Sequence, residues 1–405
     1  MLSRVHKTGL VAGFFVGLFL LAPSWPAMIG LVGVLIGLKR TVGWAEAMFL
    51  LTVVLGVIAS SRGGVIHDMG SIARNVSAGF LLLFTAKNSL ASWRRWMLLI
   101  GLGVFLALDV VHSTGIAAVV YFVLFFFVWQ LPEQLFFDDT TEVIEEVLLI
   151  VFVASLVLWI SNPDRCFLMG RLRGVFGNPN EFGLFLTPLL FYLGTGIRQG
   201  QWQKMLLFVS GLVCVYYTGS RTTLVCLLGA TSLHFGAAWF QGGVVRLSSR
   251  LLFISTFALL FLLSPLWNVM SQGFRFSSAG DFGGRIHAWK LTMATIPEHL
   301  FFGCGAGCTN ASLANMAELL ALDGHIGGVH SAYLLLANDF GLVGIFVVLL
   351  SLVLSVVSSI RLSFPILFMI GVSSVSESWL EAPLSVGTLA YILVISVWPK
   401  ETVKR

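Results

Sequence analysis

Residues 283–307 read GGRIHAWKLTMATIPEHLFFGCGAG, a polar and glycine-rich stretch in an otherwise apolar chain. The stretch lies within a longer hydrophilic segment, residues 267–330, and apolar runs of about 15 residues or more precede and follow that segment. A helix needs about 20 mostly apolar residues to cross the hydrocarbon core of a bilayer. Repeated apolar runs around one long polar loop are therefore typical of a helical membrane protein.

The composition agrees with this class. The chain has 405 residues, of which 57% are hydrophobic and 11% are charged, whereas soluble domains carry about 25% charged residues. The net charge of +5 suits the positive-inside rule and gives no indication of nucleic-acid binding. We predict an all-α polytopic membrane protein with about 12, and up to about 14, transmembrane helices and one long periplasmic loop that contains short helices.

The candidate spans divide the chain into three regions. They cover residues 9–22, 27–38, 44–60, 72–86, 96–111, 115–131, 145–160, 182–197, 204–219, 222–240, 250–266, 331–359, 363–376 and 384–398. We expect transmembrane helices with short loops over residues 1–266, the periplasmic loop over 267–330, and further transmembrane helices over 331–405.

Charge predicts the orientation. With the amino terminus in the cytoplasm, basic residues are more frequent in the cytoplasmic segments than in the periplasmic ones. The periplasmic basic residues are nearly all arginines, and a guanidinium suits a phosphate or a carboxylate. Pairing with nearby acidic residues is the alternative explanation.

Three periplasmic segments contain candidate binding residues. Residues 161–181 have Arg165, Arg171 and Arg173 before a GNPN turn, in which Asn178 and Asn180 are available for sugar hydroxyls; an ordinary turn is the alternative. Arg221 lies in the polar cluster YYTGSRTT at the edge of two apolar runs. Arg285 follows Gly284 and precedes a predicted helix that ends at Pro297, and a helix N-terminus favours an anion.

His330 lies at the start of the apolar run after the loop, so we expect it to face the periplasm. A neutral imidazole is a competent general base. No partner histidines occur at ligand spacing, so we predict no metal site. A disulfide between Cys304 and Cys308 is possible on the oxidising side.

The chain has no Walker A sequence, no dinucleotide fingerprint and no G-x-S-x-G elbow. No cofactor is therefore expected. A lipid-linked donor is the natural source of energy for chemistry in the periplasm.

The motifs GGRIHAW (residues 283–289), PEHLFFGCGAG (297–307) and VHSAYLLLANDFGLVG (329–344) resemble, in this order, the O-antigen ligase and polymerase superfamily of bacterial inner membranes. The earlier FGNPNEFG and TGSRTT are similar to upstream motifs of the superfamily.

This resemblance implies metal-independent, inverting glycosyl transfer on the periplasmic face, with a glycan on undecaprenyl diphosphate as donor. Arg221 and Arg285 would hold the diphosphate, His330 would deprotonate the acceptor, and Tyr333 would orient His330, stack on sugar or simply pack. The leading hypothesis is an O-antigen ligase with lipid A–core as acceptor. A Wzy-type polymerase, which uses a second lipid-linked glycan, is the alternative, and a transporter is a third possibility.

Overall fold

The computed structural model describes residues 138–196, 202–240, 285–305, 307–319, 329–358 and 364–376. The predicted spans before residue 138, the spans at 250–266 and 384–398, and the candidate Gly284 lie outside the described residues. The described helices are α8 (Asp138–Ser161), α9 (Pro163–Cys166), α10 (Pro179–Gly196), α11 (Trp202–Thr218), α12 (Arg221–Phe240), α15 (Arg285–Thr295), η4 (Ile296–His299), α16 (Cys308–Leu319), α17 (Ala332–Ser358) and α18 (Phe364–Ser376).

The predicted helical class is confirmed for these residues. Helices α8, α10, α11, α12, α17 and α18 each coincide with a predicted apolar span to within a few residues, apart from the start of α8. Across the described ranges, no helix combines the length and the uninterrupted apolar character needed to cross a membrane.

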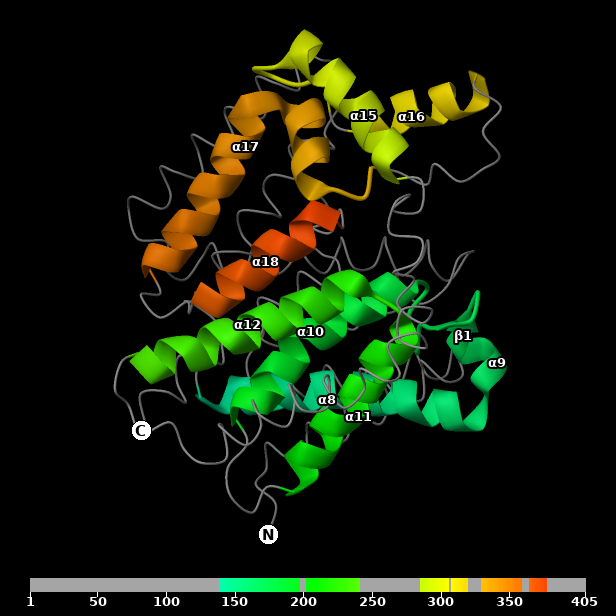
Figure 1. The fold of residues 1–405 in the computed structure, drawn as a ribbon, viewed down its shortest axis with the longest axis vertical. Helices are drawn as coiled ribbons and strands as arrows, with labels where there is room; N and C mark the ends of the chain where they lie inside the picture. The colour runs from blue at the N-terminus through cyan, green and yellow to red at the C-terminus, as the bar shows by residue number, and fades with distance from the viewer. Residues whose placement is uncertain are drawn as a thin grey trace.

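The lower layer of the molecule is built on α10. Helices α11 and α12 pack against α10, and α18 lies along α12 (Figure 1). Phe176 stacks on Phe182 with ring centroids 5.4 Å apart, and Phe185 lies 5.2 Å from Phe176. All three rings are fully buried, and aromatic pairs of this kind stabilise a core beyond the area they bury. They hold the segment before α10 against the helix itself.

A small hairpin joins α8 to α10. Strands β1 (Phe167–Leu168) and β2 (Arg171–Leu172) are antiparallel, and Phe167 pairs with Leu172. Met169 and Gly170, the two turn residues, have φ angles of 51° and 74°, as a two-residue hairpin turn of the primed type requires. The sequence predicted a turn at residues 177–180 but neither this turn nor the strands, because two-residue strands carry no detectable alternation.

The upper layer consists of α15, η4, α16 and the first half of α17, which lie together at one end of the molecule (Figure 1). The predicted helix after Arg285 is present as α15, and Pro297 lies in η4 directly after it. Helix α17 differs from the prediction of one continuous span, because it bends at Gly341, where φ is 65° and ψ is −164°.

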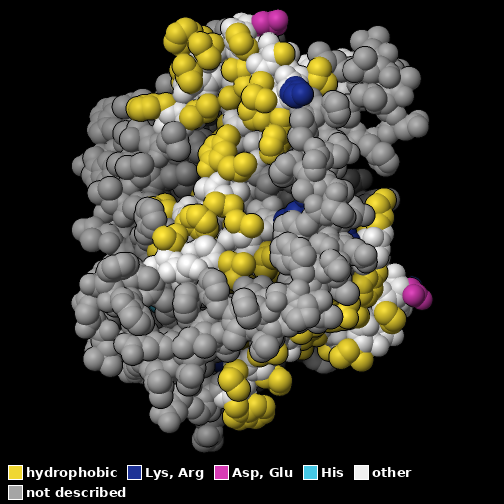
Figure 2. Space-filling view, in the orientation of Figure 1, with side chains coloured by type: hydrophobic (Ala, Val, Ile, Leu, Met, Phe, Trp, Pro, Cys, Tyr) yellow, Lys and Arg dark blue, Asp and Glu magenta, His cyan; other side chains and the backbone are white. Residues whose placement is uncertain are grey.

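Hydrophobic side chains make up most of the described surface on the face drawn in Figure 2. The described Lys, Arg, Asp and Glu side chains on that face are scattered singly. On α11, the exposed large side chains are Trp202, Met205, Leu206, Val209, Val213 and Tyr217. Most of these recur at intervals of three or four residues, so they form an apolar stripe along one side of the helix.

Candidate active site

His330 has an unusual backbone conformation directly before α17. Its φ is 48°, in the left-handed region that few residues other than glycine adopt. The neighbouring Val329 and Ser331 are buried, whereas His330 is half-buried. Because a left-handed residue costs free energy, its surroundings must hold it there, and such residues are frequent at functional sites.

Helix α15 and the first half of α17 run side by side in the same direction. Near the start of both helices, the indole Nε1 of Trp289 donates to the Val329 carbonyl oxygen at 2.7 Å. Further along both, the Thr295 hydroxyl lies 2.9 Å from Asn338 Oδ1 and 2.9 Å from the Thr292 carbonyl oxygen of α15, so its one proton is shared between these two acceptors. The two helices are therefore parallel, and their N-terminal ends lie at the same end of the pair (Figure 1).

This alignment puts two predicted site positions at the same end of the helix pair. Arg285 is the first residue of α15 and lies one turn before Trp289 on the same side of the helix. His330 directly follows Val329, whose carbonyl receives the Trp289 bond. A hydrophobic cluster of Ala288, Leu313, Val329 and Leu335 fills the space between α15, α16 and α17. The backbone positions of Arg285 and His330 are therefore set by the same contact.

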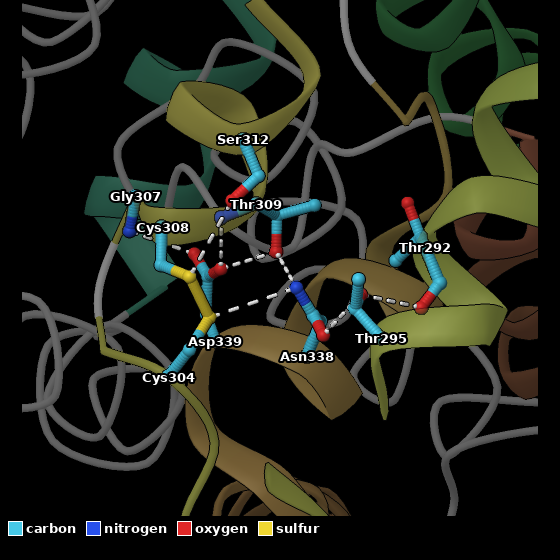
Figure 3. Close-up of a disulfide and its surroundings, with 9 residues drawn as sticks. All are labelled: Thr292, Thr295, Cys304, Gly307, Cys308, Thr309, Ser312, Asn338 and Asp339. Atoms are coloured by element: carbon cyan, nitrogen blue, oxygen red, sulfur yellow. Dashed lines mark hydrogen bonds between the residues drawn. A yellow bond between two sulfur atoms is a disulfide. The ribbon is translucent and has the colours of Figure 1, made fainter. Parts of the chain in front are cut away.

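The other end of the helix pair holds a buried polar network (Figure 3). The Asp339 carboxylate accepts from the Gly307 N–H at 2.7 Å, from the Thr309 N–H at 2.9 Å and from the Thr309 hydroxyl. The Asn338 side-chain amide donates to the Thr309 hydroxyl oxygen at 2.8 Å. Asn338 and Asp339 are each 2% exposed, and these bonds satisfy polar groups that would otherwise be costly to bury.

A disulfide joins Cys304 to Cys308 beside this network. The sequence left this pairing open, and the structure contains it. The two sulfurs and the Asp339 carboxylate are close enough to suggest metal ligands. With the sulfurs bonded to each other, however, no thiolates are available to a metal.

The bend of α17 is made by the loop before α16. In a continuous helix, the N–H groups of Leu342 and Val343 would donate to the carbonyls of residues 338 and 339. Instead they donate to the carbonyls of Leu300 and Phe301, at 2.8 and 3.1 Å. The carbonyls of residues 338 and 339 accept from the N–H groups of residues 304 and 305, at 2.8 and 2.9 Å. The loop thus replaces the helical bonds that the bend removes.

Arg221 lies at the start of α12, in the lower layer. Ser220 caps the helix, because its hydroxyl accepts from the Thr223 N–H at 3.4 Å, and Thr218, Ser220 and Thr223 are all buried. Helix α12 lies along α18, and the Tyr333 hydroxyl of α17 donates to the Gly371 carbonyl of α18 at 3.2 Å. Arg221 is therefore connected through α18 to the end of α17 that carries His330. The Trp289–Val329 hydrogen bond, which positions Arg285, does not involve the Arg221 segment.

The hairpin connects to the Arg221 segment. Arg171 donates to Asn180 Oδ1 at 2.6 Å and to the carbonyl of Thr218, three residues before Arg221, at 2.7 Å. Asn178 Oδ1 accepts from the Asn180 N–H at 2.9 Å, as in an ordinary Asx turn.

The remaining two arginines of residues 161–181 flank the hairpin, Arg165 in α9 and Arg173 directly after β2, and lie beside each other. Arg173 donates to the Arg165 carbonyl at 3.2 Å and to the Gly177 carbonyl at 3.4 Å. Arg165 is exposed and Arg173 is half-buried. Of the predicted substrate-binding residues, Arg171 thus binds both Asn180 and the Arg221 segment, while Arg165 in α9 and Arg173 after β2 bind each other.

Sequence reasoning gave no role to Asn338, Asp339 or Thr309. The signal that could have identified the first two is a polar pair inside a long apolar run, since buried polar residues in such runs need partners. Thr309 carried no signal, because its role depends on the folded loop.

The described residues therefore define a class of helical protein. In this class, an arginine begins one helix, a histidine directly precedes a second, parallel helix, and both lie at the same end of the helix pair. The sequence profile of one family, described as O-antigen ligase, matches residues 206–349. This region contains Arg221, Arg285 and His330 and carries a domain of that family, which confirms the resemblance seen in the motifs. A comparison with the curated proteins gave no match.

Proposed function

We propose that the protein is a glycosyltransferase of the bacterial inner membrane. It transfers O-antigen polysaccharide from undecaprenyl diphosphate to lipid A–core on the periplasmic face, within lipopolysaccharide biosynthesis. The observation that carries the proposal is the alignment of α15 with α17, which places Arg285 and His330 at one end of a helix pair inside the family region.

The two arginines hold the diphosphate of the donor. Arg285 and Arg221 are each the first residue of a helix, where the helix dipole favours an anion. Negative charge on the diphosphate grows as its bond to the sugar breaks. Guanidinium groups placed to meet this charge lower the barrier.

His330 is the general base. It takes the proton from the acceptor hydroxyl as that oxygen attacks the anomeric carbon of the donor. A new glycosidic bond forms, the bond from the anomeric carbon to the diphosphate oxygen breaks, and undecaprenyl diphosphate leaves. A single displacement of this kind inverts the anomeric configuration. The diphosphate bond supplies the free energy, so the step requires neither a nucleotide nor a metal.

The glycan lies against the hairpin side of the site in this proposal. Arg165, Arg173 and Asn178 offer donors and acceptors to sugar hydroxyls. Arg171 and Asn180, which bind each other, keep the Arg221 segment in place. Tyr333 sits one turn beyond His330, and its bond to α18 supports a role in fixing α17.

The membrane location is supported by composition and by the described surface. The chain is 57% hydrophobic and only 11% charged. The apolar stripe of α11 includes Trp202 and Leu206, which are 64% and 58% exposed. Exposed apolar surface of this extent usually has a partner, and lipid is the partner that fits an uncharged stripe.

An acceptor assay tests the function. Purified full-length protein in lipid should join glycan to lipid A–core when given the lipid-linked glycan and lipid A–core together. If longer lipid-linked glycans form instead, and lipid A–core stays unmodified, the protein is a polymerase. No glycan product with either acceptor would contradict the proposed transfer.

A further inference from the structure

The buried network around Asn338 and Asp339 lies at the opposite end of α15 from Arg285, so it cannot touch a substrate held there. We propose that it is a clamp that positions Arg285 relative to His330. The clamp consists of Thr295, the Cys304–Cys308 disulfide, Thr309, Asn338 and Asp339. This inference rests on the proposed function, and it assigns a positioning role, not a catalytic one, to these residues.

The Asn338 side chain connects three parts of the upper layer. Its Oδ1 accepts from Thr295 at the end of α15, and its Nδ2 donates to Thr309 in α16 and approaches the sulfur of Cys304 at 3.6 Å. The amide therefore uses both its donor and its acceptor on neighbouring elements. Because its own backbone belongs to α17, it joins α15, α16 and the disulfide loop to α17 (Figure 3).

Asp339 fixes the disulfide loop. Its carboxylate accepts the N–H groups of Gly307 and Thr309, one on each side of Cys308. The disulfide closes the same short loop at Cys304. The loop is thus held by its backbone, by the disulfide and by a buried carboxylate.

Two glycines allow the loop and the bend to approach each other. At Gly303, where φ is 74°, a Cβ atom would overlap the backbone of Asp339. At Gly341, where φ is 65°, a Cβ atom would overlap the backbone of Phe301. Side chains are therefore excluded from both faces of the contact. The motifs FFGCGAG and NDFGLVG are the two halves of one structural unit.

The clamp fixes how far α15 can slide along α17. The Thr295–Asn338 hydrogen bond holds the C-terminal end of α15 against α17. The Trp289–Val329 hydrogen bond holds the end of α15 that carries Arg285. Loss of the Thr295 bond frees α15 to shift, and Arg285 shifts with it. Misplacing a catalytic group by about 1 Å can cost about a hundredfold in rate.

Thr295→Val tests this directly, because valine keeps the shape and removes the hydroxyl. Thr292→Val is the matched control: the same change on the same helix, where the lost bond runs only to the Ala288 carbonyl within α15. We expect Thr295→Val to lower kcat about tenfold or more, with less change in KM, and Thr295→Ser to restore it. Equal kcat values for Thr295→Val and Thr292→Val would overturn the proposal.

A double-mutant cycle separates positioning from general damage. If the clamp acts through Arg285, Thr295→Val should cause little further loss of rate in an Arg285→Ala background. The same fold-loss in both backgrounds would mean that the clamp does not act through Arg285. If Arg285→Ala alone transfers glycan at the normal rate, the role of Arg285 is wrong and the clamp has nothing to position. If the unmodified protein transfers no glycan to either acceptor, the proposed function itself is wrong, whatever the clamp does.

Hydrogen exchange gives a readout that does not need activity. In the full-length protein, amides of residues 285–295 should exchange faster in Thr295→Val and in Asp339→Asn than in Thr292→Val. If α15 keeps the same protection in all three variants, the network does not hold the helix and the clamp is refuted.

Discussion

Three polar residues carry the proposed active site of this mostly apolar chain. His330 adopts a left-handed conformation, and Arg285 and Arg221 each begin a helix. The three residues are far apart in sequence. His330 and Arg285 are nevertheless both positioned by one contact, the hydrogen bond from Trp289 to the Val329 carbonyl. The chemistry we propose depends on these few positions.

Arg285→Lys should separate charge from geometry. Lysine keeps the positive charge but loses the planar fork that binds two phosphate oxygens. We expect the rate of glycan transfer to fall about tenfold to a thousandfold, in the range seen when one donor to a developing charge is lost. Lys290→Ala, at an exposed position on the same helix, is the control. A normal rate for Arg285→Lys would show that charge alone suffices.

The helices and the loop show what sequence patterns could and could not predict. Apolar runs predicted α10, α11, α12 and α18, and Gly-Gly-Arg before a helix-compatible stretch predicted the start of α15. The bend of α17 was not predictable, because the apolar run over residues 331–359 continues beyond Gly341 and is interrupted there only by the polar pair Asn338 and Asp339. The bend exists because the loop at residues 300–305 replaces helical hydrogen bonds, and that pairing joins distant parts of the sequence.

Gly341→Ala should disrupt the bend. Alanine there meets both a backbone conformation that is essentially confined to glycine, with φ 65° and ψ −164°, which costs about 1–3 kcal/mol, and overlap with the Phe301 backbone. We expect the Cys304–Cys308 loop to become sensitive to protease and glycan transfer to be lost. Gly307→Ala shares the left-handed φ, at 78°, but has no atom within 4 Å of the new Cβ. If the two variants behave alike, the overlap at the bend is not what matters.

The molecule as a whole is expected to cross the inner membrane with both ends in the cytoplasm. Arginine and lysine placement predicted that orientation, and the apolar stripe of α11 is consistent with contact to lipid. In this arrangement the upper layer, with α15, α16 and the start of α17, faces the periplasm. In the proposed function, the donor and the acceptor meet there.

Topology reporters check the orientation. Alkaline phosphatase fused within residues 267–284 should be active, because it folds only outside the cytoplasm. A fluorescent protein fused after Arg405 should fluoresce, because it matures in the cytoplasm. The opposite pair of results would place the proposed site on the wrong side of the membrane for a lipid-linked periplasmic donor.

The most direct test is the rate of glycan transfer to lipid A–core by His330→Asn. Asparagine tolerates left-handed backbone, so the variant should insert and fold like the unmodified protein while lacking a base. We expect the rate to fall about a hundredfold to ten-thousandfold, the usual contribution of a general base. His299→Ala, which removes an exposed histidine of η4, should transfer normally. Normal transfer by well-inserted His330→Asn would contradict the assignment of His330 as the base.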